Sequence, residues 1–461
     1  MTKFNSIRLL ITLAVSALLA SPVTHAAISG VTGTTFNMSA SEGYISVADG
    51  GSIYTWGYSV DGLAMQLPGP TLIVTEGDTV TINLTNHLPK AAGNVSMVFM
   101  GQQVTATGGV SGALTNEAQN GGSVTYTFTP SGPGTYQYHS GTRSDLQVEM
   151  GLYGALIVRP DATQSGAVTC PDSMTPGVIQ QPAYNHLGSC YDREYLFQTS
   201  SIDYQLHVAV EAQSKGPGPI VLTDDAFDSS EYWLLNGRVG PDTMAGNGTG
   251  LLPHQPYGSL ARMHPGEKVL IRLIGAGREN HPFHTHGNHS RVLARDGNML
   301  LTDTGSLAGP TLYTLLTVPG STTDSIFEWT GKDLGWDMYG HSETDGLICN
   351  DTDGDGYNDY VGEINSAPAH EYCADHNKAI PVTLPSFNSL AFGGFYSGSP
   401  YLGDLALLAP GEGGLNPNAG FSYMWHSHTE RELVNNDVFP GGLMTMMIVE
   451  APYVDINPDE Y

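Results

Sequence analysis

The sequence contains histidines whose spacing suits a metal ion. Four of its 16 histidines fall within HPFHTHGNH, residues 281–289. His284 and His286 are two residues apart, and so are His426 and His428 in the segment WHSH. Because side chains alternate across a β-strand, each pair should point to one face, with about 7 Å between its members. Two such strands side by side would bring four imidazoles together and form a pocket for one or two metal ions.

The ligand type alone does not choose the metal. Imidazole nitrogen binds copper, zinc, iron and nickel. The competing interpretation is a buried histidine network without metal, which would require hydrogen-bond partners for several clustered ring nitrogens. We favour metal binding.

The elements that must position these histidines read as β-strands. The chain has 57 glycines and 28 prolines spread along its length. In TVTINLTN, Val80, Ile82 and Leu84 share one face and polar residues share the other, as in a half-buried strand. Convincing amphipathic helices are scarce, so the expected fold class is all-β.

An internal repeat divides the chain into two domains. GTYQYHSGTRSDLQVEMGLYGALIVRP, residues 134–160, is echoed by residues 420–452, which implies two copies of one sandwich. The expected first domain covers 28–160, a linker covers 161–190 and the second domain covers 191–454. The second domain is about twice too long for one sandwich, so we expect an insertion at about 342–419.

Four segments together resemble the multicopper oxidases, in particular the two-domain type related to copper nitrite reductases. They are PGPTLIVTEGDTVTINLTN, HPFHTHGNH, WHSH and GGLMTMMIV. The resemblance implies two cupredoxin-like, Greek-key β-sandwich domains. In that family, HPxHxH and HCHxxxH segments each supply two ligands to the trinuclear copper cluster. Those ligands correspond here to His284, His286, His426 and His428, and the type 1 copper ligand of HPxHxH corresponds to His281.

The sequence also departs from the family pattern. Ser427 stands where HCH has its cysteine, and Glu432 replaces the histidine that follows. A hydroxyl cannot replace the thiolate of a blue copper site, so we expect no conventional type 1 centre. His281, Ser427 and Glu432 would then form a polar network or a weak hard-metal site, of which we favour the network. Three methionines of the last strand, Met444, Met446 and Met447, are expected to fill the core.

The first domain has lost most of its corresponding ligands. Where the family has a phrase such as SIHWHG, this chain has Val98 and Met100 in place of both histidines. Only His139 corresponds to a family ligand in this domain. The family cluster takes eight histidines and this chain offers five, so we expect one or two copper ions. In two-domain relatives the cluster forms between subunits, commonly in trimers, so a homotrimer would let His139 complete the site.

An acidic loop lies within the expected insertion. Asp351, Asp353, Asp355 and Asp359 occupy the first, third, fifth and ninth places of an EF-hand-like loop. Place twelve is Gly362, which departs from that motif. A structural calcium ion and a merely solvated acidic loop are both consistent with this segment, and we favour calcium.

The four cysteines indicate two disulfides in an exported protein. The local pairs would be Cys170 with Cys190 and Cys349 with Cys373, although four cysteines permit three connectivities. Residues 1–26 have a basic start, an apolar run and a small-residue end, which is typical of a signal peptide for a secreted or periplasmic protein. No later apolar stretch reaches the roughly 20 residues of a membrane span.

The charge balance argues against nucleic acid as a partner. Residues 1–26 hold two of the 17 basic residues and no acidic ones, which leaves 15 basic and 45 acidic residues, or a net charge of about −30. Two functions remain open. One is a copper oxidoreductase that acts on a small molecule or metal ion with dioxygen, with Glu430 or Glu432 carrying protons. The other is a non-catalytic extracellular protein that binds and sequesters copper.

Overall fold

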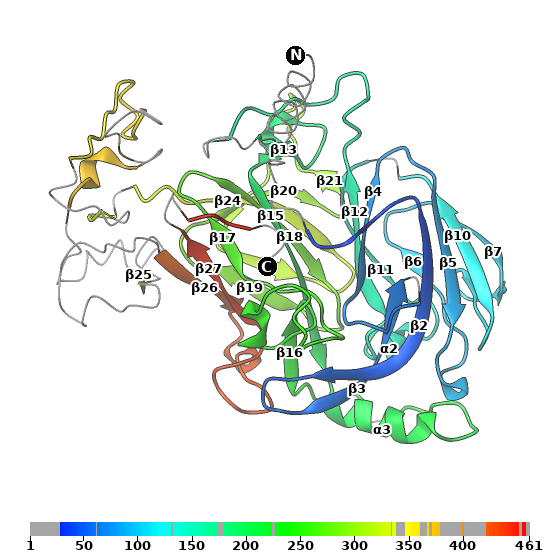
Figure 1. The fold of residues 1–461 in the computed structure, drawn as a ribbon. Coiled ribbons are helices and arrows are strands. Elements are labelled where there is room, and N and C mark those ends of the chain that lie inside the picture. Colours follow the sequence, from blue (N-terminus) through cyan, green and yellow to red (C-terminus); the bar gives the residue numbers. More distant parts are fainter. Residues whose placement is uncertain are drawn as a thin grey trace, which may run out of the picture.

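The computed structural model describes most of the chain beyond residue 27. The described residues are 28–60, 62–130, 132–173, 179–223, 226–227, 229–332, 334–337, 346–359, 367, 371–378, 399–400, 421–450 and 454–457. The expected signal peptide and most of the expected insertion lie outside these ranges. Strands dominate the described elements, which confirms the all-β prediction (Figure 1).

The first half of the chain forms two five-stranded sheets. One has the order β1 (Val31–Thr32), β4 (Gly69–Thr75), β12 (Tyr153–Arg159), β11 (Gly134–His139) and β6 (Val98–Phe99). The other has the order β3 (Ser52–Val60), β2 (Thr35–Ser46), β5 (Val80–Asn86), β10 (Ser123–Phe128) and β7 (Thr105–Gly108). Side chains of both sheets share one core. Val80, Ile82 and Leu84 are fully buried in it, as their alternation predicts.

The second half also forms two sheets. The larger has the order β16 (Tyr232–Leu235), β15 (Arg193–Ile202), β18 (Lys268–Gly275), β24 (Thr322–Glu328), β20 (Ser290–Arg295) and β21 (Asn298–Met299), with β22 (Thr311–Leu312) also on β20. The smaller has the order β17 (Ala261–Met263), β27 (Met444–Val449), β26 (Phe421–Ser427), β19 (His281–Thr285) and β23 (Thr314–Thr317), with β25 (Ser399–Pro400) on β26. Phe283, Trp425 and Phe327 pack together in the core between these sheets.

The two halves repeat one strand arrangement. In the first, β11 pairs antiparallel with β12, and β12 pairs in parallel with β4. In the second, β26 pairs antiparallel with β27, and β27 pairs in parallel with β17. The sequence repeat of residues 134–160 and 420–452 therefore coincides with the same strand pair in each half. By this correspondence β6 of the first half matches β19 of the second, since each lies beside the first strand of its pair.

Shorter elements and disulfides connect these sheets. The small strands are β8 (Val110–Ser111), β9 (Asn116–Glu117), β13 (Gln181–Pro182) and β14 (Cys190–Tyr191), and the α-helices are α2 (Ser144–Gln147) and α3 (Tyr204–Ser214). The sequence reading missed α3, whose first turn is capped by Asp203 accepting from the Leu206 amide. Both local disulfides are present, with Cα–Cα distances of 5.8 Å for Cys170–Cys190 and 5.4 Å for Cys349–Cys373.

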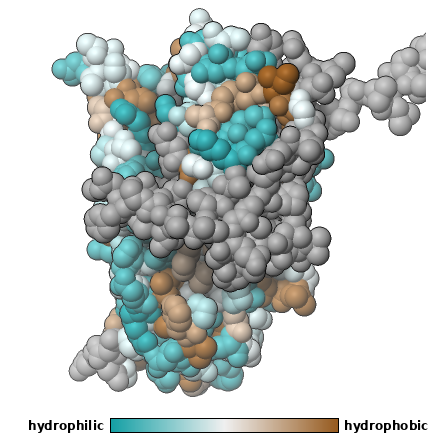
Figure 2. All heavy atoms as spheres, turned by 90° about the vertical axis from the view of Figure 1, so that its left-hand side faces the viewer, coloured by the Kyte–Doolittle hydropathy of each residue, from teal (hydrophilic) through white to brown (hydrophobic). Residues whose placement is uncertain are grey.

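Among the described residues, no helix is both long and apolar enough to cross a bilayer. On the face drawn in Figure 2, the hydrophobic side chains of the described residues occur in small groups among hydrophilic ones.

Candidate metal centre

The paired histidines meet on two neighbouring antiparallel strands. His284 of β19 lies directly opposite His426 of β26. His286 and His428 follow these strands on the same face, and the His428 amide donates to the Pro282 carbonyl at 2.8 Å. The ring centroid of His284 lies 4.8 Å from those of His286 and His428 and 5.6 Å from that of His426. The structure thus gathers the four imidazoles that the sequence places on two strand faces.

Hydrogen-bond partners hold the Nδ1 atoms of two of these side chains. His426 Nδ1 lies 2.6 Å from the Ser427 carbonyl oxygen, which can only accept, so Nδ1 carries the hydrogen and Nε2 keeps its lone pair in the neutral ring. His284 Nδ1 lies 2.8 Å from Thr314 Oγ1. His426 Nε2 faces His286 Nε2 at 3.2 Å. A metal-binding histidine usually has such a partner on its other nitrogen, because that partner orients the ring.

The local electrostatics favour the neutral form of His284 and His426. Burial, reinforced by repulsion from the neighbouring imidazoles, lowers the pKa of His284 to about 4. Burial also lowers the pKa of His426. Neutral imidazole is the form that binds a metal, so these two side chains are ready to do so at neutral pH. The cluster is open on one side, where the His428 side chain is 50% exposed.

Three further side chains lie at this cluster. Tyr313 presents its ring edge-on to His284 at 5.4 Å and to His289 at 4.9 Å, and it is 52% exposed. Thr314 lies opposite His284 on β23. The sequence points to His289 as a candidate site residue, because it belongs to the histidine-rich segment. The sequence does not point to Thr314 or to Tyr313, which precedes β23, because the position of this strand beside β19 depends on strand pairing.

Two of the three residues expected to form a polar network are hydrogen-bonded to each other. His281 points away from the four-histidine face and is fully buried, and its Nδ1 lies 2.9 Å from Glu432 Oε2. Ser427 is also fully buried, and its hydroxyl accepts from the Thr429 amide at 3.2 Å. The thiolate that a blue copper site needs is absent, so these residues do not fit a type 1 copper ion.

The methionines of the last strand divide between two faces. Met447 is fully buried in the core, as expected. Met444 lies opposite His426 and Met446 lies opposite Met424, so both share the histidine-bearing face of the sheet and are only half-buried. The expectation that all three fill the core is therefore wrong for Met444 and Met446.

His139 lies at the end of β11, in the first half. Its Nδ1 lies 2.9 Å from the Ser140 carbonyl oxygen, the same arrangement that His426 has with Ser427, and burial lowers its pKa. Opposite it on β6 stands Val98, whereas His426 has His284 opposite. Within the described part of the chain, no recorded contact joins His139 to the four-histidine cluster.

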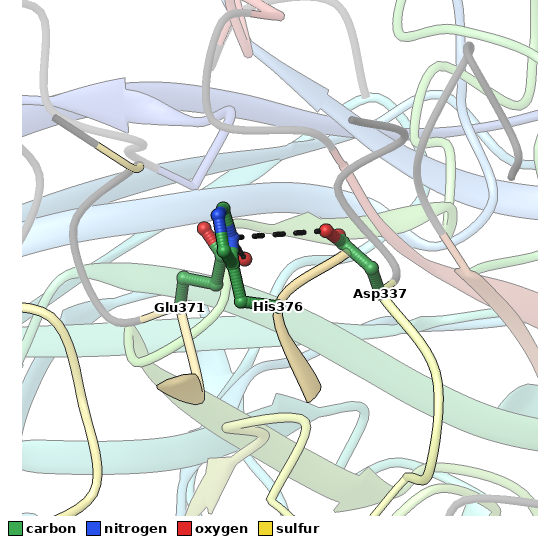
Figure 3. A group of neighbouring side chains, drawn as sticks. All are labelled: Asp337, Glu371 and His376. Atoms are coloured by element: carbon green, nitrogen blue, oxygen red, sulfur yellow. Dashed lines mark hydrogen bonds and ion pairs between the residues drawn. The ribbon is translucent and has the colours of Figure 1, made fainter. Parts of the chain in front are cut away.

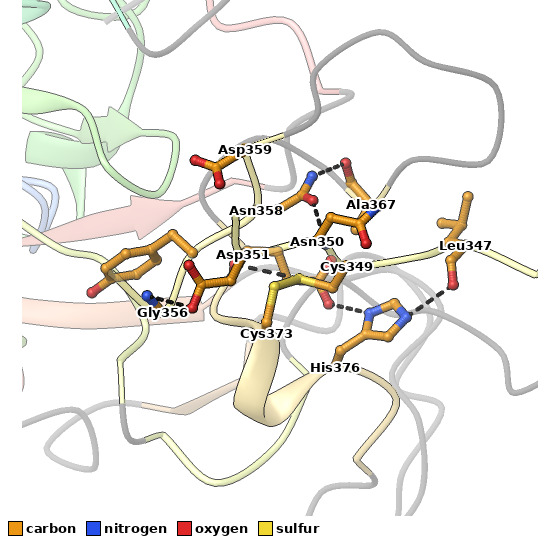
Figure 4. Close-up of a disulfide and its surroundings, with 12 residues drawn as sticks. Leu347, Cys349, Asn350, Asp351, Gly356, Asn358, Asp359, Ala367, Cys373 and His376 are labelled. Carbon is orange, nitrogen blue, oxygen red and sulfur yellow. Dashed lines mark hydrogen bonds and ion pairs between the residues drawn. A yellow bond between two sulfur atoms is a disulfide. The ribbon is translucent and has the colours of Figure 1, made fainter. Parts of the chain in front are cut away.

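Three of the four aspartates of the acidic loop come together. Ligand oxygens of Asp351, Asp353 and Asp359 lie within 4.8 Å of one another, and all three residues are exposed. Asp355 stands outside this group, and its carboxylate accepts from the Tyr357 amide at 2.8 Å. Figure 4 shows the loop beside the Cys349–Cys373 disulfide. Calcium binding here stays a prediction, which calcium titration of wild type against Asp351→Asn would test.

Comparison with known proteins supports the family resemblance. Residues 53–163 match the family model of the multicopper oxidases. Laccase-3 of Oryza sativa subsp. japonica is 29% identical over 267 residues, which span 57% of this chain and 39% of the laccase. Multicopper oxidase MCE of Talaromyces pinophilus is 41% identical over 98 residues, which span 21% of this chain and 15% of that protein. The chain thus spans less than half the length of both relatives.

Two solved copper proteins are similar to this chain over much of its length. A blue copper oxidase from Nitrosomonas europaea has 19% identity and a TM-score of 0.48, with 90% of this chain and 85% of that chain covered. A copper nitrite reductase from the same organism has 20% identity and a TM-score of 0.44, with 65% and 85% covered. On the strength of the sequence matches, this chain carries a multicopper oxidase domain over residues 53–163 and is a homologue of laccases.

Proposed function

We propose that the protein is an exported copper oxidoreductase that oxidises a small molecule or a metal ion with dioxygen. The observation that carries this proposal is the convergence of His284, His286, His426 and His428, with the Nδ1 atoms of His284 and His426 held by hydrogen-bond partners. These four side chains would hold one or two copper ions. Copper would supply one-electron redox chemistry, and the residues themselves determine access and proton handling.

Substrate approaches the cluster directly in this proposal. Ser427 stands in place of the cysteine through which the family passes electrons. The His428 side chain is half exposed, so a substrate can reach the cluster from that side. The Glu430 carboxylate lies 3.3 Å from His428 Nδ1 and is 78% exposed, so it can exchange protons between this histidine and solvent. Glu432 is held by His281 on the opposite face and does not fit this role.

The same proposal includes the oligomeric state of the protein and its export from the cytoplasm. A homotrimer would place His139 of one subunit at the cluster of another, which sedimentation analysis and copper counting of His139→Ala would test. Export is proposed because residues 1–26 have the features of a signal peptide. Mass spectrometry of the mature N-terminus would test whether this segment is removed.

The alternative is extracellular copper binding without turnover. It is supported by the His281–Glu432 hydrogen bond, because His281 corresponds to the family's type 1 copper ligand and its Nδ1 atom is engaged by a carboxylate here. Under this alternative the four histidines bind copper, but no oxygen is consumed.

Copper content, spectra and oxygen uptake separate these possibilities. Copper-loaded wild type should retain copper without an intense blue absorption band, and it should consume oxygen with at least one of phenols, Mn(II), Fe(II) or Cu(I). His284→Ala with His426→Ala should lose both copper and uptake, whereas His87→Ala, an exposed histidine of the first half, should retain them. Copper retention without uptake would support the binding alternative. Equal copper content in all three proteins would refute the site.

A further inference from the structure

A second group of metal-ligand side chains lies away from the histidine cluster. Asp337 follows β24, and Glu371 and His376 flank Cys373 in the following segment (Figure 3). One ligand atom from each lies within 4.8 Å of the other two. The side chains of Asp337, Glu371 and His376 are 0%, 2% and 14% exposed. The group is therefore a buried one, unlike the exposed aspartates of the acidic loop.

The hydrogen bonding of His376 fixes which ring nitrogen faces the carboxylates. Its Nε2 lies 3.1 Å from the Leu347 carbonyl oxygen, and because that oxygen can only accept, Nε2 must carry hydrogen (Figure 4). Nδ1 lies 2.5 Å from Glu371 Oε1 and 3.9 Å from Asp337 Oδ2. In the neutral ring, Nδ1 would present a lone pair to two carboxylates. Such an arrangement repels unless a shared cation, either a proton or a metal ion, lies among the three atoms.

The surrounding charge favours a divalent cation. Asp375 is a third buried carboxylate, and together with Asp337 and Glu371 it lines a small cavity. Lys378 pairs with Asp375 at 3.2 Å but is half exposed to solvent. Two of the three ligand side chains are carboxylates, and a proton on His376 would supply them with a single positive charge. A divalent ion would supply two positive charges and leave the imidazole neutral.

The backbone around these side chains is held in place. The Cys349–Cys373 disulfide joins their segment to residues 346–350. The Asn358 amide donates to the Glu371 carbonyl at 3.0 Å, and the Asn377 amide donates to Asp337 Oδ2 at 2.8 Å. The ligand positions therefore do not depend on the ion alone, which lowers the entropy cost of binding.

We propose that Asp337, Glu371 and His376 bind a divalent transition metal, for which zinc is the best fit. One imidazole and two carboxylates form a ligand set suited to zinc, with a fourth position left for water. The ion would tie the segment that follows β24 to the disulfide-bonded loop. This inference does not depend on copper chemistry at the histidine cluster.

Zinc content measured by mass spectrometry tests the proposal. Wild type, Glu371→Gln and Glu328→Gln would be stripped with chelator, loaded with zinc and desalted. Glu328 ends β24 and is half exposed, so the same substitution there is a matched control. We expect wild type and Glu328→Gln each to retain one more zinc ion per chain than Glu371→Gln does. The histidine cluster is present in all three proteins and does not affect this difference.

Equal zinc content in the three proteins would overturn the proposal and show that the shared cation is a proton. Circular dichroism would show whether Glu371→Gln folds. If it does not, the His284→Ala/His426→Ala variant decides the matter. That protein keeps only two of the four clustered histidines. It should still retain one zinc per chain at Asp337, Glu371 and His376, and a zinc-free result would overturn the proposal.

Discussion

At the scale of single residues, Ser427 and Glu432 depart from the multicopper oxidase pattern that the sequence resembles. Ser427 offers a hard hydroxyl where the family has a soft thiolate, and Glu432 offers an acceptor where the family has a second imidazole. In the structure Glu432 takes the Nδ1 atom of His281 as its hydrogen-bond partner, whereas the Ser427 hydroxyl accepts from the Thr429 amide. A potential ligand has become part of a buried polar pair.

This pair should contribute measurably to folding stability. Glu432→Leu would leave His281 Nδ1 buried without its partner, and a lost partner of this kind costs about 1–3 kcal/mol. We expect urea denaturation of the copper-free protein to show that decrease. Glu430→Leu changes a highly exposed carboxylate of the same turn and should alter stability by about 0.5 kcal/mol or less. Equal effects of the two substitutions would contradict a stabilising role for the His281 contact.

At the scale of elements, the neighbouring strands decide which imidazole nitrogens can bind a metal. β19 and β26 supply the four histidines, while β23 supplies Thr314, which lies opposite His284 and contacts its Nδ1 atom. The outer strand thus orients a side chain on the strand beside it. Ligand orientation of this kind affects metal affinity without changing the ligand set.

Removing this orienting contact should weaken copper binding selectively. Thr314→Val keeps the β-branched shape but removes the hydroxyl, so we expect copper affinity to fall about 10- to 100-fold. Competition with a chelator of known affinity would measure the change. Thr311→Val, on the exposed strand β22, provides the control and should bind copper as wild type does. Unchanged affinity in Thr314→Val would show that Thr314 Oγ1 does not orient the metal-binding ring.

The same elements show how far the sequence could predict the site. Alternation is a local property, so it correctly placed Val80, Ile82 and Leu84 on a buried face and each histidine pair on one face. Strand pairing is not local. Strand pairing places Thr314 of β23 and the preceding residue, Tyr313, beside His284, and it places Met444 opposite His426. The periodicity of the sequence determines neither arrangement. The Asp337–Glu371–His376 group was missed because its members are 34 and 5 residues apart and join only through tertiary structure.

At the scale of the whole molecule, the two halves share a buried interface. One hydrophobic cluster contains Ile53 and Ile157 from the first half and Leu196 and Ile274 from the second. Beside it, Arg159 of β12 forms an ion pair with Glu194 of β15, which also accepts from Arg272 Nε at 2.9 Å. The side chains of Glu194 and Arg272 are almost fully buried. Burial makes such charges costly unless every partner is in place.

The interface should therefore weaken in acid. Burial opposes the charge of Glu194, but Arg159 and Arg272 overcome it and lower the pKa of this carboxyl from 4.5 to about 2. Between these values the unfolded chain takes up a proton that the folded chain refuses. The stabilisation is therefore complete above about pH 4.5 and is lost as the pH falls toward 2, and a shift of this size corresponds to about 3 kcal/mol.

Urea denaturation between pH 6 and pH 2.5, repeated for two variants, isolates this contribution from the other carboxylates. Glu194→Gln cannot take up the proton, so its stability should start lower at pH 6, because Arg159 and Arg272 lose their charge partner, and then fall less steeply with acid. Glu328→Gln, a half-exposed carboxylate, should keep the wild-type slope. If Glu194→Gln instead falls as steeply as wild type, the acid sensitivity arises elsewhere in the chain. A shallower slope for Glu194→Gln alone would place it at the contact between the two halves.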